Sequence, residues 1–336
     1  MVKQRERGFF HGPFLPKEVT IMRKKNADAL PSQRKKSNFT KFKSQLPLHI
    51  MLIPAVISLF IFNLIPLVGL KIAFEKFVPI KGLFGNQKWV GWKNFELLFS
   101  MPNFLEIMRN TILIAVGKII FGMFVAIVVS LLLNEIRAMK FKKTVQTIVY
   151  APFFLSWVVF GGILITILSP GEGIVNQLIT ALGLKSVFFL GDPKVFPLTL
   201  ILTDTWKNFG MSTIVYLATL TGVDPGLYEA ASIDGANRFQ QVIHISLPAM
   251  GPIIMLTAIL NIGSILNAGF DQVLVLYNSQ VMSTGDIIDT FVYRMGLKEM
   301  QYGLSTAVGL FKSVISCFLM TSAYYLSYKF SDYRVW

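Results

Sequence analysis

The chain has 336 residues, of which 53% are hydrophobic and only 15% are charged, and its formal net charge is +14. Soluble proteins carry about 25% charged residues, so this composition excludes an ordinary water-soluble domain and indicates a membrane protein. The basic excess does not indicate nucleic-acid binding, because 12 of the 32 Lys and Arg lie in the first 47 residues, directly before an apolar segment. Such a tail is typical of the cytoplasmic side of a membrane, near anionic lipid headgroups. The single Cys317 leaves no partner for an internal disulfide.

Six segments are candidates for crossing a bilayer core of about 30 Å, which takes about 20 helical residues. They cover residues 48–70, 110–134, 147–169, 196–220, 247–270 and 307–330. The first is too long for a cleaved signal peptide, so we expect it to be retained. The fourth is the least apolar, because it contains Asp204 and Lys207. The sequence therefore predicts an all-α membrane protein with six transmembrane helices.

The distribution of basic residues orients these spans. With both termini in the cytoplasm, the cytoplasmic segments hold 19 Lys and Arg and the external loops hold 9. Most of the difference comes from the N-terminal tail. Because basic residues concentrate in cytoplasmic segments, this pattern predicts a multi-pass protein with cytoplasmic N- and C-termini.

The connection between the fourth and fifth spans carries the most specific pattern in the chain. Asp224 suits a helix N-cap, and Pro225 suits the first helical position. Gly235 suits the left-handed residue that follows the end of a helix. Together they predict a short helix over residues 225–234.

Small and acidic residues share this short helix. Ala230 and Ala231 leave one face nearly bare, so another surface can approach closely, and Glu229 and Asp234 place negative charge near that face. These features are typical of a docking element. A second short helix is predicted over residues 236–245, with Leu247 and Pro248 ending it and starting the fifth span.

This loop matches a known motif at every fixed position. The motif is Glu-Ala-Ala, three residues, Gly, nine residues and Ile-x-Leu-Pro, as found in permeases of bacterial binding-protein-dependent ABC importers. The matching positions are Glu229, Ala230, Ala231, Gly235, Ile245, Leu247 and Pro248. The chain resembles this family from about Phe104 to Tyr328.

The resemblance implies a type I ABC importer permease fold with a cytoplasmic coupling helix. It implies a basic cytoplasmic tail (1–47), a first transmembrane helix with an outside loop (48–103), a permease core with five transmembrane helices (104–328) and a C-terminal tail (329–336). The coupling helix would dock on the ATPase subunit, with Glu229 facing a basic group of that subunit, Asp234 beside it and Gly235 allowing the turn. The location implied is the cytoplasmic membrane of a bacterium.

The resemblance also implies the partners: a second homologous permease, two ATP-binding subunits, an extracytoplasmic solute-binding protein and membrane lipid, with no nucleic acid. The chain has no Gly-x-x-x-x-Gly-Lys-Ser/Thr loop and no recognisable nucleophile–base arrangement. We therefore expect a permease rather than an enzyme, with no cofactor of its own, no metal site, and ATP and Mg²⁺ used by the partner subunits.

Three further stretches resemble permeases of the oligosaccharide and polysaccharide (maltose-permease-like) group. They are residues 261–272, 286–294 and 302–312. The implied function is translocation of an oligosaccharide by alternating access, driven by ATP hydrolysis in partner subunits. The alternatives are a permease of an amino-acid or other small-solute ABC importer and an ion-coupled secondary transporter.

Polar residues within the spans are candidates for the substrate path, because a charge inside a membrane needs a partner or water. Asp204 and Lys207 are three positions apart and could pair on one helix face. An aromatic ring and hydrogen-bonding groups would suit a sugar. The candidates are Asp204, Trp206, Lys207, Asn208, Asn261, Asn267, Asp271 and Gln272. Interhelical packing and hydrogen bonding are the alternative role for each, and the partners of Lys118 and Lys312 stay open.

Overall fold

The structure is a computed structural model that describes the backbone of residues 38–330 and the side chains of residues 45–325. Most of the predicted N-terminal tail and the last six residues lie outside the described residues. Contacts divide the chain after Leu67 into two units.

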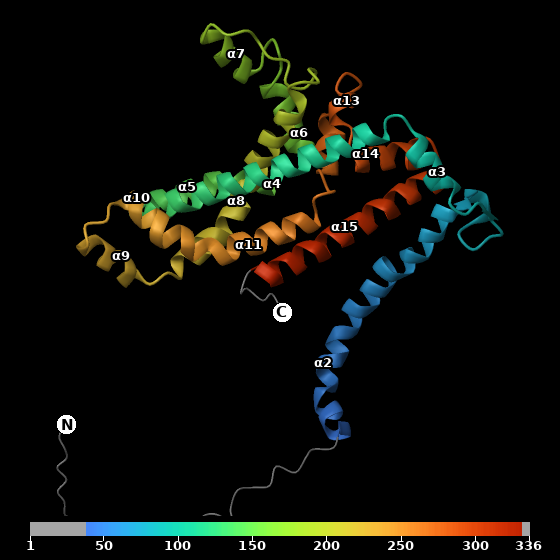
Figure 1. Cartoon of the computed structure of the whole chain (residues 1–336), viewed down its shortest axis with the longest axis horizontal. Helices are drawn as coiled ribbons and strands as arrows, with labels where there is room; N and C mark the ends of the chain where they lie inside the picture. The colour runs from blue at the N-terminus through green and yellow to red at the C-terminus, as the bar shows by residue number, and fades with distance from the viewer. Residues whose placement is uncertain (1–37, 331–336) are drawn as a thin grey trace, which may run out of the picture. The chain divides into compact units, whose positions relative to one another are not determined.

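Unit 1 contains one long apolar helix. Helix α2 (Asn38–Leu59), drawn in blue in Figure 1, continues into the π-helical turn η1 (Phe60–Leu64). Residues 45–67 are all exposed within this chain, although most of them are apolar. In water such a surface would be unstable, so this helix requires lipid or another protein around it.

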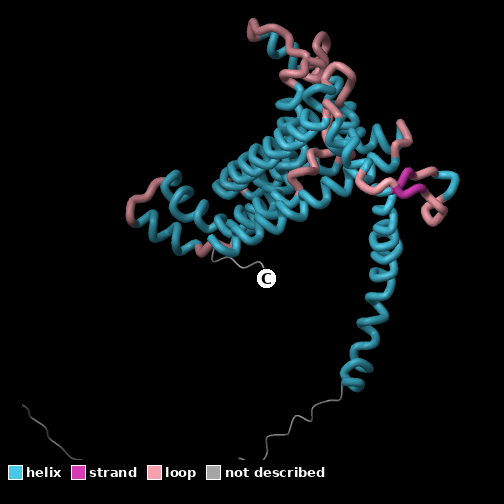
Figure 2. Tube along the Cα trace, turned by 45° about the vertical axis from the view of Figure 1, so that its right-hand side comes forward, coloured by secondary structure: helices cyan, strands magenta, loops and turns pink. Residues whose placement is uncertain are grey.

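Unit 2 is helical except for one short antiparallel sheet, which pairs Glu75 with Trp89 (magenta in Figure 2). Its elements in chain order are η2 (Ile65–Phe74, which begins in unit 1), β1 (Glu75–Lys76), η3 (Pro79–Lys81), β2 (Lys88–Trp89), α3 (Lys93–Ser100), α4 (Phe104–Glu135), α5 (Met139–Tyr150), η4 (Ala151–Phe154), α6 (Trp157–Ile167), α7 (Ile174–Ala181), α8 (Phe196–Thr221), α9 (Pro225–Ile233), α10 (Arg238–Gln241), η5 (Val242–Ser246), α11 (Leu247–Gly263), α12 (Phe270–Leu276), α13 (Met282–Gly285), α14 (Ile288–Tyr293), η6 (Arg294–Lys298) and α15 (Tyr302–Phe330).

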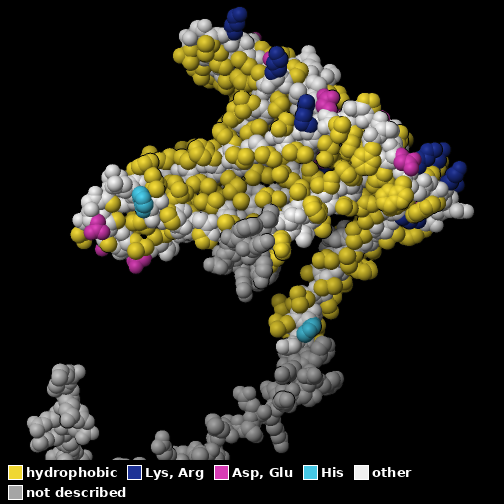
Figure 3. Space-filling view, in the orientation of Figure 1, with side chains coloured by type: hydrophobic (Ala, Val, Ile, Leu, Met, Phe, Trp, Pro, Cys, Tyr) yellow, Lys and Arg dark blue, Asp and Glu magenta, His cyan; other side chains and the backbone are white. Residues whose placement is uncertain are grey.

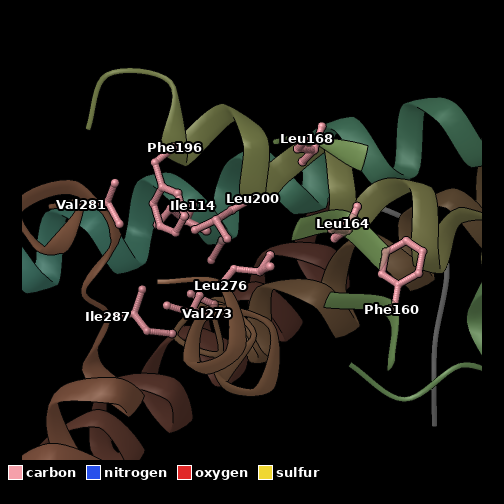
Figure 4. Close-up of a cluster of buried hydrophobic side chains, with 12 residues drawn as sticks. Ile114, Phe160, Leu164, Leu168, Phe196, Leu200, Val273, Leu276, Val281 and Ile287 are labelled. Carbon is pink, nitrogen blue, oxygen red and sulfur yellow. The ribbon is translucent and has the colours of Figure 1, made fainter. Parts of the chain in front are cut away.

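The core of unit 2 forms where α4 packs along α8. Gly117 lets the two helices approach closely, since a Cβ atom there would lie 2.3 Å from the side chain of Ile201. The largest buried cluster joins these two helices to α6, α12 and the segment before α14 (Figure 4). Its fully enclosed members include Ile114, Leu164 and Leu200. Helices α11 and α15 also pack on each other.

Helix length and composition account for most of the predicted spans. Among the described residues, four helical segments are long and apolar enough to cross a membrane: Gln45–Phe74, Phe104–Glu135, Arg238–Gly263 and Tyr302–Tyr325. Helix α8 has 26 residues, which is long enough, but its polar residues keep it out of this group. Figure 3 shows apolar side chains over the long helices of unit 2, with charged side chains gathered toward its ends. The fold is thus a mostly helical membrane fold, while the count of six spans is not confirmed.

The third predicted span is broken rather than straight. Residues 139–154 and 157–167 meet at an angle of 105°. Pro152 lies in the 3₁₀ turn η4, and the hydroxyl of Ser156 accepts a hydrogen bond from the N–H of Val159 at 3.3 Å to start α6. The proline ends the first helix, and the serine cap begins the second. The prediction of a continuous span over 147–169 is therefore wrong.

The fifth span also differs from its prediction. Helix α11 ends at Gly263, whereas the predicted span ran to residue 270. Turns follow it, including a hydrogen bond from the N–H of Asn267 to the carbonyl oxygen of Ser264 at 2.7 Å. Gly269 has a φ of +90° and precedes the new helix α12. The chain therefore passes through this region as a helix, a loop and a short helix. The loop places polar backbone groups and side chains between the two helices.

Candidate functional site

The predicted short helix between α8 and α11 is present as α9 (Pro225–Ile233), at one end of unit 2 (Figure 1). The Asp224 carboxylate accepts a hydrogen bond from the N–H of Gly226 at 2.9 Å, so Asp224 is the N-cap. At the other end, the N–H of Ala236 donates to the carbonyl oxygen of Ala231 at 2.9 Å, and Gly235 has a φ of +82°. This pair of features is a Schellman cap. The predicted start and stop of the helix are confirmed.

The outer face of α9 is exposed and acidic. Glu229, Ala230 and Asp234 are all exposed, and Ala231 is half-buried. Among the described residues, neither Glu229 nor Asp234 has a cationic partner within 4 Å. Figure 3 shows acidic side chains at this end of unit 2. The face can therefore accept a basic partner without breaking an existing ion pair.

The segment after α9 differs in part from its prediction. Asn237 and Gln240 form a reciprocal capping box that starts α10. The helix then runs through the π-helical turn η5 into α11 and is continuous over Arg238–Gly263. Leu247 and Pro248 therefore do not end it. The reason is that Pro248 lies in the first turn of α11, where its missing N–H is tolerated after the π-helical turn.

Side-chain hydrogen bonds hold α9 against the following helix. The Tyr228 hydroxyl lies 2.9 Å from that of Ser246, and the Gln241 amide donates to the hydroxyl of Ser232 at 2.9 Å. Sequence reasoning missed these residues, because contacts between two short helices leave no periodic signal. A hollow of about 320 Å³ lies between the helices. It is lined by Ala231, Asp234, Gly235, Ala236, Gln240, Gln241, His244 and Ile245.

A second polar region lies inside the helix bundle of unit 2. A cavity of about 230 Å³ is bordered by residues of α4, α8 and the end of α11 with its following loop. Four candidates for the substrate path line it, namely Asp204, Asn208, Asn261 and Asn267. Its polar lining is completed by Lys118, whose partner the sequence left open, and by Thr205, Ser212 and Ser264, which the sequence analysis did not single out. Loops and helices distant in sequence make this cavity, which is why spacing alone did not indicate it.

Lys118 of α4 organises this cavity. Its Nζ atom lies 3.5 Å from Asp204 Oδ1 and donates a hydrogen bond to the carbonyl oxygen of Ala268 at 2.6 Å. It also donates to the side-chain oxygen of Gln272. The Gln272 amide donates in turn to Leu200 O, at 2.8 Å. Lys118 thus joins α4 to α8 and to the loop before α12, while the Asp204 carboxylate stays the more accessible partner.

The predicted pairing of Asp204 with Lys207 is wrong. Lys207 instead donates to the carbonyl oxygen of Phe153 at 3.0 Å, and its ammonium lies 5.5 Å from the ring centres of Phe153 and Trp157. Helical spacing allowed the pair, but neighbouring helices supply each charge with another partner.

The remaining candidates lie outside the lining of this cavity. Trp206 packs edge-on against the ring of Phe160, with ring centres 5.1 Å apart. Asp271 is exposed in the first turn of α12, and Gln272 is fully buried. Whether any candidate contacts a substrate stays a prediction.

One lining hydroxyl has no partner. Thr205 is 4% exposed, and its Oγ1 atom has no hydrogen-bond partner within the structure. A buried polar atom without a partner costs free energy, roughly 1–3 kcal/mol. Because Thr205 borders the cavity, water or a ligand hydroxyl there would satisfy it.

Two further ion pairs lie toward the other end of the bundle. Arg294 binds Asp286 at 2.5 Å, and Lys312 binds Asp289 at 2.5 Å. Burial tends to lower the pKa of Arg294, but the hydrogen bonds and charge of Asp286 outweigh it and raise the pKa. The backbone carbonyl oxygen of Asp286 also accepts a hydrogen bond from the side-chain amide of Asn110 in α4. These contacts link the start of α14 to α4.

The comparisons with known proteins agree with this arrangement. Residues 118–332 match the family described as the inner membrane component of binding-protein-dependent transport systems. The chain belongs to this family. It is similar to protein LplB of Bacillus subtilis (strain 168), with 38% identity over 313 residues that cover 93% of this chain and 98% of the relative. It is also similar to YteP of the same organism, a polygalacturonan/rhamnogalacturonan transport system permease protein, with 39% identity covering 89% and 93% of the two chains.

Solved structures show the same fold. A chain in the crystal structure of a bacterial ABC transporter involved in the import of the acidic polysaccharide alginate matches with a TM-score of 0.80 and 34% identity, covering 88% of this chain and 99% of that chain. A second structure of a bacterial alginate ABC transporter, in complex with an alginate pentasaccharide-bound periplasmic protein, matches with the same TM-score and identity. The predicted type I permease fold is confirmed, and this family member is an ABC importer permease subunit of the membrane rather than an enzyme.

Proposed function

We propose that this permease translocates an oligosaccharide across the cytoplasmic membrane by alternating access. The observation that carries the proposal is the cavity between α4, α8 and α11, in which Asp204, Asn208, Asn261 and Asn267 converge. Carboxylates and amides are the groups that bind sugar hydroxyls. The similarity to YteP and to the alginate importer chain supports the same substrate class.

In this proposal the substrate hydroxyls bind to the cavity. Asp204, which lies 3.5 Å from the Lys118 ammonium, accepts hydrogen bonds from the sugar. Thr205 gains a partner for its unpaired hydroxyl. A permease of an amino acid would need a pair of opposite charges free to bind the substrate, whereas the lysine and the aspartate here already bind each other. The saccharide therefore fits better than the amino-acid alternative.

Helix α9 is the proposed coupling element. Its exposed acidic face would dock on the ATPase subunit, and the continuous helix from Arg238 to Gly263 would carry that movement to the loop beside the cavity. This division of labour assigns ATP and Mg²⁺ to the partner subunits and no cofactor to this chain. The coupling residues proposed are those of the motif, with Tyr228 and Ser246 transmitting force across their hydrogen bond.

The proposed complex contains further partners. The first apolar helix has exposed side chains throughout residues 45–67, which supports lipid and a second homologous permease as its neighbours. One similar structure contains a substrate-bound periplasmic protein, which supports an extracytoplasmic binding protein as the source of the substrate. The basic tail and the cytoplasmic α9 would lie on the same side of the membrane.

Substitutions of Gly235 test the coupling role. Its φ of +82° is favourable for glycine, less favourable for asparagine and unfavourable for a β-branched residue. There is space for a side chain, because an added Cβ would meet no atom within 4 Å. The expected order of ATP-driven saccharide uptake is wild type, Gly235→Asn, Gly235→Ala and Gly235→Val. For alanine, left-handed strain of about 1–2 kcal/mol predicts roughly a fivefold to thirtyfold loss of productive docking, and valine should lose more.

The measurement is uptake by proteoliposomes that contain the complete importer, with ATP enclosed. Gly251→Val is the matched control, because Gly251 lies in α11, has no positive φ and has open space around it. Insertion of every variant into the membrane should be unchanged. Normal uptake and normal ATPase co-purification of Gly235→Val would contradict the coupling role, and uptake driven by an ion gradient without ATP would contradict the importer.

A further inference from the structure

A second cavity lies beside the first one and has a different lining. Its volume is about 630 Å³, and it is bordered by α12, α14, η6 and α15. It shares Asn267 and Gly269 with the cavity of Asp204. The two cavities therefore both border the loop between α11 and α12.

The lining of the second cavity combines aromatic rings with an ion pair. Phe270 and Tyr293 contact each other with ring centres 5.6 Å apart, and Tyr302 lies on the same lining. Lys312 Nζ lies 2.5 Å from Asp289 Oδ1. All five side chains are only partly buried, so none is sealed inside the protein.

The ion pair shows what kind of environment this cavity needs. Lys312 belongs to a helix that is long and apolar enough to cross the membrane. The side chain of Asp289 is 24% exposed and that of Lys312 is 16% exposed. Charges at membrane depth face a protein interior or a watery cavity, because hydrocarbon does not solvate them. The second cavity is thus suited to water and polar ligands rather than to lipid tails.

We infer that this cavity is a second saccharide subsite, which binds a further sugar unit of the substrate held by the first cavity. The inference rests on the proposed function. Rings such as those of Tyr293 and Phe270 can cover the apolar face of a sugar. The Asp289 carboxylate, held 2.5 Å from the Lys312 ammonium, accepts hydrogen bonds from sugar hydroxyls.

The sizes of the two cavities favour a ligand that spans both. Small-molecule sites usually have about 300–1,000 Å³. The first cavity, at about 230 Å³, is smaller than this range, whereas the second, at about 630 Å³, lies within it. A saccharide short enough to be held by the first cavity alone would leave the second one empty. The second cavity would therefore contribute to transport only when the saccharide chain is longer.

Both acids are more exposed than their lysines. In the first cavity the Asp204 side chain is 20% exposed and that of Lys118 is 8% exposed, and the order is the same for Asp289 and Lys312. Each pair therefore leaves its acceptor more accessible than its cation. The sugar unit in the second cavity is therefore bound through its hydroxyl groups rather than through a carboxylate.

The test measures how uptake depends on saccharide length. Proteoliposomes containing the complete importer are given galacturonan oligosaccharides and arabino-oligosaccharides of two to five units, with ATP enclosed. The variants are Tyr293→Ala and Asp289→Asn in the second cavity and Asn208→Ala in the first. The expected result is that Asn208→Ala lowers uptake at every length. The second-cavity variants should raise KM about tenfold for four or five units and leave two units unchanged.

Three further variants separate binding from folding. Tyr293→Phe keeps the ring and should retain uptake of the longer saccharides. Asp289→Asn leaves Lys312 without its carboxylate, so the double variant Asp289→Asn/Lys312→Met, which removes both charges, should assemble normally and still lose long-chain uptake. Tyr325→Ala is the matched control, because Tyr325 is exposed further along α15 and borders neither cavity.

Each outcome decides the inference. Equal loss at all lengths for Tyr293→Ala, or no loss at any length, would overturn the second subsite and leave the proposed function standing. Normal long-chain uptake by the assembled double variant would overturn the role of the ion pair and with it the subsite. If the wild-type importer takes up neither saccharide series, both the proposed function and this inference fail.

Discussion

The buried ammonium of Lys118 binds partners that lie far away in the sequence. Lys118 and Asp204 belong to different helices, and their ion pair of 3.5 Å forms only when α4 packs along α8. Lys118 also has two acceptors that are not charged, Ala268 O and Gln272 Oε1. These contacts satisfy the ammonium of a lysine residue that is 9% exposed, which is the condition for tolerating it at membrane depth.

Removing the carboxylate should therefore cost more than removing both charges. Asp204→Asn leaves Lys118 without an anion, and we expect it to lower the stability of the purified permease complex by about 2–3 kcal/mol, because the two remaining acceptors compensate in part. The double variant Lys118→Met/Asp204→Asn should regain much of this loss. Thermal unfolding of the complexes in detergent measures both. A double variant as unstable as the single one would contradict the pairing.

Close contacts between helices depend on particular glycines rather than on any small residue. Gly161 and Gly162 are neighbours in α6, but only Gly161 meets another element: a Cβ there would lie 2.5 Å from the Val275 side chain of α12. No atom lies within 4 Å of a Cβ added at Gly162. The two adjacent positions are thus a natural test of packing between α6 and α12.

Gly161→Ala should destabilise the protein by roughly 1–3 kcal/mol, because Val275 is β-branched and has little rotamer freedom to move away. Gly162→Ala should be neutral or stabilising by less than about 1 kcal/mol, since alanine favours the helix. The same thermal unfolding assay compares them. Equal effects of the two substitutions would show that α6 and α12 do not pack as closely as described.

At the scale of the whole molecule, membrane orientation connects the two proposed sites. The proposed function predicts that helix α9 and the basic N-terminal segment lie on the ATPase side, and that the loop at residues 170–195 lies on the other side. The segment that leads into this loop, residues 139–154 and 157–167, is bent by 105°.

Reporter fusions test this orientation. A fluorescent protein fused after Trp336 should fluoresce, whereas alkaline phosphatase fused there should stay inactive, because both termini are expected in the cytoplasm. Alkaline phosphatase inserted within residues 170–195 should be active. Active phosphatase at the C-terminus would reverse the topology and would separate α9 from the ATPase subunit.

The sequence by itself determined the features that depend on a few neighbouring residues. Asp224, Pro225 and Gly235 set the start and stop of α9 through hydrogen bonds within one or two turns, so the cap residues and their spacing were enough to predict it. Composition likewise determined that the chain is a membrane protein, because such a large apolar surface is stable only when lipid covers it.

Only the tertiary structure decided which polar groups meet. Helical spacing pairs Asp204 with Lys207, yet packing of α4 on α8 offers Lys118 instead. The break before α6 and the early end of α11 come from local caps and turns that apolar length conceals. Both cavities lie between elements distant in sequence, since the groups that line them converge only after the helices have packed.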